Sequence, residues 1–261
     1  MRCTISAVKY AALSLALVAA ATSCRTKSKP TDTVAVPVVT HGSLKVTFTN
    51  TVAGKQVVNG PIIYNTLAGN NYNITMLKYF VSNFTLVKDD NTERNFANYK
   101  LIDGLDSTTW SFTLDSVANG TYKAVRFYLG VDYAHNHTLN QGGDLAPSSG
   151  MIWSWNTGYI FFKHEGSYRN DTTSVNLLPL VYHYGTDSAL AVVDLPVGSF
   201  DVASNTKQLT LNFDLNTLYA TPTPVNFYRN NSHQSTDTTD RPWIANLRGN
   251  FPHAFSFVKV Q

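Results

Sequence analysis

Short segments with alternating hydrophobic and polar residues run along most of the chain after residue 43. Residues 44–49, 74–87 and 122–129 are rich in Tyr, Phe, Val and Thr, which half-buried strands favour. Only residues 214–219 have a helical pattern, and it is short. Many short strands without a long amphipathic helix predict an all-β fold. The expected architecture is an antiparallel β-sandwich with Greek-key-like connections and long functional loops. The other predicted strands are at residues 159–166, 189–195, 208–213 and 253–260.

Turn-forming residues separate these strands. Asp89-Asp90-Asn91 is typical of a tight turn, and Asn119-Gly120 predicts a hairpin between strands at residues 110–117 and 121–131. Two long polar loops are expected at residues 132–149 and 221–241. Long irregular loops on a rigid sandwich commonly carry function.

The N-terminus has the features of an export signal. Arg2 and Lys9 precede an apolar run over residues 10–21, which is too short for a permanent membrane span. The run leads through small residues to Cys24, as in a bacterial lipobox, so we expect a lipid on Cys24, with a plain signal peptide as the alternative. The expected organisation is a signal peptide at residues 1–23, a lipid-anchored flexible tether at 24–42 and one β-sandwich domain at 43–261.

Cysteine content and charge exclude several classes of protein. The only cysteine besides Cys24 is Cys3 in the signal, so the mature domain has no thiol for disulfides, zinc or catalysis. Five of the 20 basic and one of the 17 acidic residues precede residue 43, which leaves a near-neutral domain and argues against nucleic acid as a partner. Standard hydrolase, phosphate-loop, zinc-protease and haem-attachment motifs are missing, so we expect a binding protein and not an enzyme.

Residues 150–159 contain two of the four tryptophans, two positions apart. In an extended segment Met151, Trp153 and Trp155 would share one face. A buried stripe with sulfur–aromatic packing is the simplest interpretation. Stacking on a sugar, contact with a partner protein and a redox site beside an oxidisable indole are the alternatives.

The histidines are the candidate metal ligands. His135 and His137 would point the same way in an extended segment, which suits a metal, whereas in a loop they would be solvated. His183 follows an apolar run and is interpreted as a buried, hydrogen-bonded histidine. His253 is expected to begin the final strand in a structural or supporting role. The remaining histidines are interpreted as bystanders: His164 at an exposed strand end, His41 in the tether and His233 in a mobile loop.

Several segments match a known family in combination and in order. They are residues 77–83, 129–132 leading to 136–137, 150–163, 165–166, 182–185 and 251–255. Together they resemble the MbnP-like family of exported copper-binding proteins, which includes lipoproteins of Bacteroidota. The resemblance covers nearly the whole predicted domain.

The resemblance implies a β-sandwich that binds one copper ion through histidines. It also implies that a partner MauG-like dihaem peroxidase converts one tryptophan to kynurenine. The amine and carbonyl of kynurenine would add a copper ligand beside the imidazoles. Neutral imidazole itself suits copper. His137 and His183 match the family histidines and are the metal-ligand candidates. Trp155, and then Trp153, are the candidates for oxidation. Further candidates beside the site are His135, His253 and Met151.

We therefore expect a membrane-anchored extracytoplasmic protein for copper acquisition or handling, with an outer-membrane transport protein as a further partner. The periplasmic face is favoured over the cell surface, because no acidic export tag follows Cys24. The alternative is a lipoprotein that holds no metal and binds a substrate or partner on an aromatic platform of Trp153 and Trp155.

Overall fold

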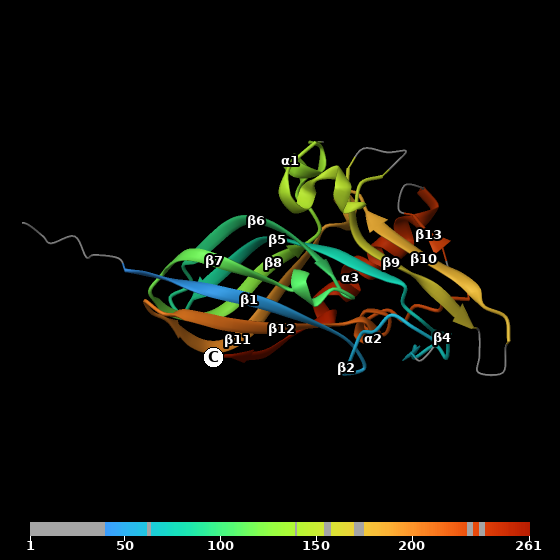
Figure 1. The fold of residues 1–261 in the computed structure, drawn as a ribbon, viewed down its shortest axis with the longest axis horizontal. Helices are drawn as coiled ribbons and strands as arrows, with labels where there is room; N and C mark the ends of the chain where they lie inside the picture. Colours follow the sequence, from blue (N-terminus) through green and yellow to red (C-terminus); the bar gives the residue numbers. More distant parts are fainter. Residues whose placement is uncertain are drawn as a thin grey trace, which may run out of the picture. The chain divides into compact units, whose positions relative to one another are not determined.

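The chain folds into two facing β-sheets, as the alternating pattern predicts (Figure 1). The computed structural model describes residues 40–61, 64–138, 140–153, 158–169, 175–228, 232–234 and 238–261. One sheet has five strands in the order β14-β12-β1-β2, with β7 also paired to β1. These strands are β1 (His41–Val52), β2 (Lys55–Gln56), β7 (Ser111–Ala118), β12 (Thr206–Asp214) and β14 (Phe255–Val260).

The second sheet has nine strands in the order β11-β8-β5-β9-β10-β13. Strand β6 also pairs with β5, and β3 and β4 extend the sheet beside β9. Most pairs are antiparallel, but β1 pairs with β12 and β10 with β13 in parallel. The strands are β3 (Tyr64–Asn65), β4 (Asn71–Tyr72), β5 (Met76–Lys88), β6 (Glu93–Asp103), β8 (Gly120–Leu129), β9 (Ile160–Arg169), β10 (Leu178–Gly185), β11 (Ala191–Val202) and β13 (Ser232–His233).

Aromatic side chains join the two sheets. Phe48 on β1 meets Phe127 on β8 edge to face, with ring centroids 5.7 Å apart, and also contacts Tyr79 on β5. The buried Tyr79 hydroxyl donates a hydrogen bond of 2.8 Å to Oδ1 of Asn50 on β1. Edge-to-face rings fill the interior while the buried hydroxyl keeps a hydrogen-bond partner, so these contacts join the two sheets.

The predicted Asn119-Gly120 hairpin is wrong. Strand β7 belongs to the five-stranded sheet and β8 to the nine-stranded sheet, so this turn carries the chain from one sheet to the other. Gly120 has φ +143°, a conformation that favours glycine. By contrast, Asp89-Asp90-Asn91 does connect paired antiparallel strands, β5 and β6.

Helices are short except for one that the sequence pattern did not reveal. Helix α3 (Arg241–Ala254) begins at the end of the predicted 221–241 loop, covers residues 242–252 for which no element was predicted, and replaces the first two residues of the predicted last strand. Among the described residues, no helix is long and apolar enough to cross a membrane. The others are α1 (Tyr133–Asn136), α2 (Leu215–Leu218) and the 3-10 turns η1 (Ser107–Thr109), η2 (Gly143–Leu145), η3 (Pro147–Ser149), η4 (Asp187–Ala189) and η5 (Thr238–Asp240).

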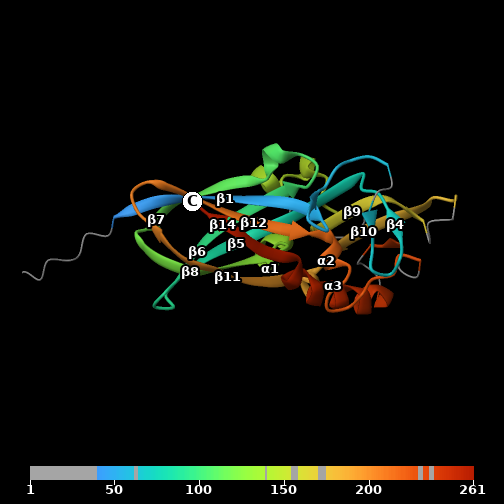
Figure 2. The same cartoon turned by 90° about the horizontal axis from the view of Figure 1, so that it is seen from below.

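Strand β1 begins at one side of both ribbon views, whereas β9, β10 and α3 lie at the other (Figures 1 and 2). A second aromatic cluster occupies the β9–β10 region, where His164 stacks on Tyr219 with ring centroids 5.8 Å apart. The expectation of an exposed His164 is therefore wrong: its side chain is fully buried, and Nδ1 lies 2.5 Å from the Tyr219 hydroxyl. Tyr72, Tyr182 and Phe227 complete this cluster.

Candidate functional site

The tryptophan segment forms one arm of a tight hairpin that leads into β9. An isolated bridge pairs Ile152 with Tyr159, and the Trp153 amide donates to the Gly158 carbonyl at 3.3 Å. The predicted alternation is present, because Met151 and Trp153 are buried whereas Ile152 is only partly buried. Trp155 lies outside the described residues. The pairing of Ile152 with Tyr159 thus places Met151 and Trp153 in the core.

Trp153 packs beside His183 on β10, with ring centroids 6.1 Å apart. The indole Nε1 donates to the Tyr159 carbonyl at 3.2 Å. Gly185 makes this packing possible: a Cβ there would lie 2.5 Å from that carbonyl oxygen and 3.2 Å from Cζ2 of Trp153. The lack of a side chain at residue 185 therefore lets the hairpin lie directly on the end of β10.

His183 is held by a carboxylate on the neighbouring strand. Its Nε2 lies 2.7 Å from Oε1 of Glu165, which Lys163 also contacts at 3.4 Å. Burial lowers the pKa of His183 below its ordinary value, outweighing the opposite effect of Glu165. Burial alone would raise the pKa of Glu165, but the hydrogen bond with His183 and the charge of Lys163 lower it. At neutral pH the site therefore holds a neutral imidazole beside a carboxylate.

The other two histidines lie at helix α1, His135 within it and His137 as its C-cap, and they point apart. Residues two positions apart on a helical turn are separated by roughly 200° around the axis. His135 Nδ1 lies 2.6 Å from the Tyr99 hydroxyl, whereas His137 stacks on Tyr133 and places Nε2 2.9 Å from Oδ2 of Asp187. The shared direction expected for an extended segment is therefore wrong. Both side chains are about two-fifths exposed, at 41% and 43%.

Asp132 caps α1 and organises the group around His135. It accepts hydrogen bonds from the His135 amide at 3.3 Å, from Asn83 Nδ2 at 2.8 Å and from the Tyr99 hydroxyl. Burial would raise the pKa of Asp132, but the hydrogen bonds from Tyr99, Asn83 and His135 lower it to about 2. Burial and the neighbouring carboxylate raise the pKa of Tyr99. His135 is thus tied to β5 and β6, on the side of α1 away from Asp187.

Asn136 connects α1 to the tryptophan hairpin. Its side chain is buried; Nδ2 donates to Oδ1 of Asp187 at 2.8 Å, and Oδ1 accepts from the Tyr159 amide at 2.8 Å. A Cβ at Gly158 would lie 2.7 Å from this oxygen. The hairpin that carries the tryptophans is therefore bounded by Asn136 on one side and by His183 on the other.

Two other expectations about histidines are corrected. His253 is not in a strand: it is exposed in the last turn of α3, and β14 begins only at Phe255. His233 is partly buried, stacks on Trp243 at 4.4 Å and places Nδ1 2.6 Å from Asp240. His41 is the first residue of β1. Cys24 lies outside the described residues.

The carboxylates Asp132, Glu165 and Asp187 are the site residues that sequence reasoning missed. Asp132 had a detectable signal, because an Asp just before a short helical turn is a common N-cap. Glu165 and Asp187 had none, since their partners come from other strands or from 50 residues away. Among the residues that the structure describes, no group of three or more His, Cys, Asp or Glu side chains is arranged to hold a metal ion.

Comparison with known proteins gives one family and one solved structure. The family model described as MbnP matches residues 41–238. The solved structure of MbnP from Methylosinus trichosporium is similar, with a TM-score of 0.49 and 17% sequence identity, over 78% of this chain and 87% of that chain. No curated protein sequence matches.

Proposed function

Because this chain belongs to the MbnP family, whose model matches residues 41–238, we propose that it binds copper outside the cytoplasm and acts in copper acquisition or handling. The ligand candidates are His137 and His183. Copper is the cargo in this proposal, and the protein is a binding protein and not an enzyme.

The pairing of each candidate imidazole with its own carboxylate carries the proposal. Glu165 lies 2.7 Å from Nε2 of His183, and Asp187 lies 2.9 Å from Nε2 of His137. A carboxylate at one ring nitrogen fixes the tautomer and orientation of an imidazole and increases the basicity of the other nitrogen. Neutral imidazole suits copper, and the lowered pKa of His183 favours the neutral form.

Two imidazoles would supply only part of a coordination shell. Among the described residues, no group of three or more His, Cys, Asp or Glu side chains is arranged to hold a metal ion. The segment that contains Trp155 connects Trp153, beside His183, to Gly158, beside Asn136. We therefore propose Trp155, after oxidation to kynurenine by a dihaem peroxidase, as the source of a further ligand. Trp153 is a weaker candidate, because it is 4% exposed and its Nε1 is hydrogen-bonded.

Copper uptake by purified protein tests the metal proposal. We expect about one copper ion per chain, and a loss of at least a hundredfold in affinity in the double variant His137→Ala, His183→Ala. The matched control is His41→Ala, His253→Ala, because both residues are exposed and lie outside the site. Thermal unfolding would show that all variants fold. Tight binding retained by the first double variant would exclude these two residues as the ligands.

Peptide mass spectrometry of protein from the native host tests the modification and the anchor separately. We expect a kynurenine at residue 155 and a lipid on the N-terminal cysteine, Cys24. Unmodified tryptophans would exclude the peroxidase partnership but leave copper binding intact. An N-terminus without lipid would exclude the membrane anchor.

The aromatic-platform alternative is disfavoured by the burial of Trp153. A sugar-binding platform needs an exposed ring face, whereas Trp153 is 4% exposed and packs against His183 and Gly185. Titration of the same preparation with copper and with a panel of glycans distinguishes the two functions. Glycan binding without copper uptake would favour the platform.

A further inference from the structure

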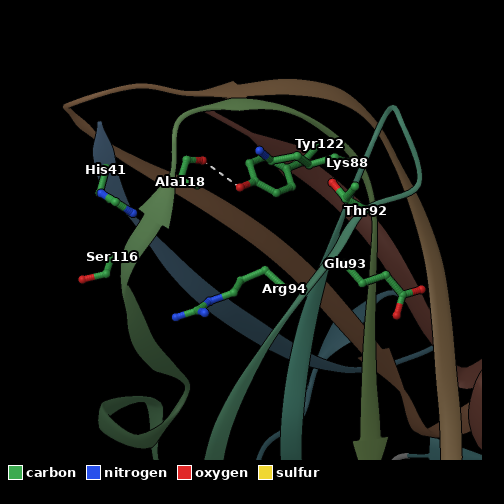
Figure 3. A pocket seen from close by; sticks show the side chains of 8 residues that line it. All are labelled: His41, Lys88, Thr92, Glu93, Arg94, Ser116, Ala118 and Tyr122. Atoms are coloured by element: carbon green, nitrogen blue, oxygen red, sulfur yellow. Dashed lines mark hydrogen bonds between the residues drawn. The ribbon is translucent and has the colours of Figure 1, made fainter. Parts of the chain in front are cut away.

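A polar pocket lies at the end of the sandwich where β1 begins, bounded by strands of both sheets (Figure 3). The buried ring of Tyr122 lies in its wall, and the Tyr122 hydroxyl donates to the Ala118 carbonyl at 2.7 Å. Its cavity volume is about 240 Å³. The lining residues are His41, Lys88, Thr92, Glu93, Arg94, Ser116, Ala118 and Tyr122.

Three basic side chains from three strands line this pocket, and in the part of the chain that the structure describes none of them forms a salt bridge within 4 Å. His41 comes from β1, Lys88 from β5 and Arg94 from β6. Lys88 lies over the Tyr122 ring at 5.7 Å and Arg94 over the Phe96 ring at 5.4 Å, and the charge of Lys88 also acts on Asp90 in the turn that follows β5. Clustered cations without a counter-charge repel one another and create a positive potential that favours an anion.

Several other cations of the domain do have carboxylate partners. Lys78 pairs with Asp103 at 3.5 Å, and Arg126 pairs with Asp194 at 2.7 Å. Lys55 and Lys207 also form no salt bridge among the described residues, so what distinguishes Lys88 and Arg94 is that both line one pocket.

The one acidic residue that lines the pocket, Glu93, is paired with Arg126, a cation that Asp194 also contacts. Glu93 accepts a hydrogen bond from Nη1 of Arg126 at 2.8 Å, and Figure 3 shows its carboxylate directed away from Arg94. It therefore does not cancel the charge of Lys88 and Arg94.

The backbone at the rim is distorted. Ser116 has φ +55°, which is uncommon for a residue other than glycine. The β1–β7 register skips at this point, since Gly42 pairs with Val117 but Leu44 pairs with Leu114. Such bulges re-aim side chains, and here Figure 3 shows the Ser116 hydroxyl directed away from Lys88 and Arg94. That hydroxyl has no hydrogen-bond partner among the described residues.

We propose that this pocket binds a phosphate group. Arg94 offers a planar fork of N–H donors that matches phosphate oxygens, and Lys88 offers a compact positive charge. The phosphate can come from free inorganic phosphate or from the headgroup of an anionic phospholipid, because both present the same oxygens.

The phosphate pocket is separate from the proposed copper site. Strand β8 begins beside the pocket and ends three residues before Asp132, the N-cap of α1. A ten-residue strand spans roughly 33 Å. Variants of the pocket should therefore leave copper uptake unchanged, and the two proposals can fail independently.

Phosphorus NMR of the full chain in maltoside micelles tests the proposal with two probes. Inorganic phosphate and monomeric dihexanoyl-phosphatidylglycerol would each be titrated with protein, and line broadening measured. We expect broadening with at least one probe, and at least tenfold weaker binding in Lys88→Ala, Arg94→Ala, since a hydrogen bond between charged groups contributes that much. The charge-matched control is Lys55→Ala, Lys207→Ala, which removes two cations outside the pocket.

Each outcome has a defined meaning. Broadening by phosphate that the control variant keeps and the pocket variant loses supports a free-phosphate site. Broadening by the lipid alone, with the same variant pattern, supports a phospholipid headgroup as the source. No broadening with either probe, or equal broadening in all proteins, overturns the proposal. Arg94→Glu provides a second test, because charge reversal should abolish binding.

Discussion

The Nε2 atom of His137 lies 2.9 Å from Oδ2 of Asp187, a residue 50 positions later in the chain. Oδ1 of the same carboxylate accepts a hydrogen bond from Asn136 at 2.8 Å. One carboxylate therefore fixes the orientation of a candidate ligand and the position of α1. Neither contact involves residues that are near Asp187 in sequence.

Asp187→Ala should weaken copper binding without removing any proposed ligand. The variant leaves the His137 ring unoriented and the buried Asn136 amide without its acceptor, and we expect about tenfold weaker copper binding and a loss of about 1–3 kcal/mol in the free energy of unfolding. Copper titration and denaturant unfolding measure the two effects. Asp187→Asn is the matched variant, because it preserves the shape but removes the charge. Unchanged copper affinity in both variants would contradict the orienting role.

Gly185→Ala should displace the tryptophan hairpin. The new Cβ would lie 2.5 Å from the Tyr159 carbonyl, which is too close without backbone movement. We expect destabilisation of about 1–3 kcal/mol, typical of overpacking, with a change in Trp153 fluorescence. Gly249→Ala is the control: nothing lies within 4 Å of its Cβ, and alanine in helix α3 should be neutral or stabilising by up to about 1 kcal/mol. Equal effects at both positions would show that the hairpin does not depend on Gly185.

His164 should make the fold sensitive to mild acid. Burial lowers its pKa from 6.5 to about 4. Between these values the unfolded chain binds a proton that the folded chain does not, so stability is retained above pH 6.5 and falls as pH decreases toward 4. The loss is about 3 kcal/mol.

Replacement by Phe, which cannot titrate, tests this origin. His164→Phe should flatten the dependence of unfolding free energy on pH between 4 and 6.5, whatever its effect at pH 8. His253→Phe, at an exposed helix end, is the control and should keep the wild-type slope. If wild type and His164→Phe had the same slope, another group would be the source of the acid sensitivity.

Asp132 should contribute stability that survives to lower pH. Its folded pKa of about 2 lies below the ordinary 3.8, so its contribution is complete above pH 3.8 and disappears as pH falls toward 2. We expect about 1–2 kcal/mol, allowing for partial exposure of the carboxylate. Tyr99→Phe removes one hydrogen bond to Asp132, so NMR titration should give a higher Asp132 pKa. An unchanged pKa would show that Tyr99 does not stabilise the charged carboxylate.

The strands were predictable because alternation has a period of two whatever the tertiary context. Helix α3 was not, because Gly249 and Pro252 interrupt its pattern and its apolar residues Trp243, Ile244, Leu247 and Phe251 become informative only when packed against β10 and β12. The burial of His164 was equally hidden, since its hydrogen-bond partner Tyr219 is 55 residues away in the sequence.

For the candidate site, the sequence located the tryptophan hairpin and His183, because local patterns determine both. It could not indicate whether His135 and His137 diverge, since that depends on whether residues 133–136 form a strand or a helical turn. Asp132 decides this by capping the turn. The carboxylates that orient the imidazoles were missed because their pairing is a property of the fold.

The parallel pairing of β1 with β12 has a consequence for the order in which the chain can fold. Residues 43–51 find their partners at residues 206–214, so this sheet cannot close until most of the polypeptide is available. Contacts so distant in sequence make folding slow, because a long loop must be ordered before they form. A partly synthesised chain that ends before β12 would keep one edge of its first strand open, and only the complete polypeptide can cover it.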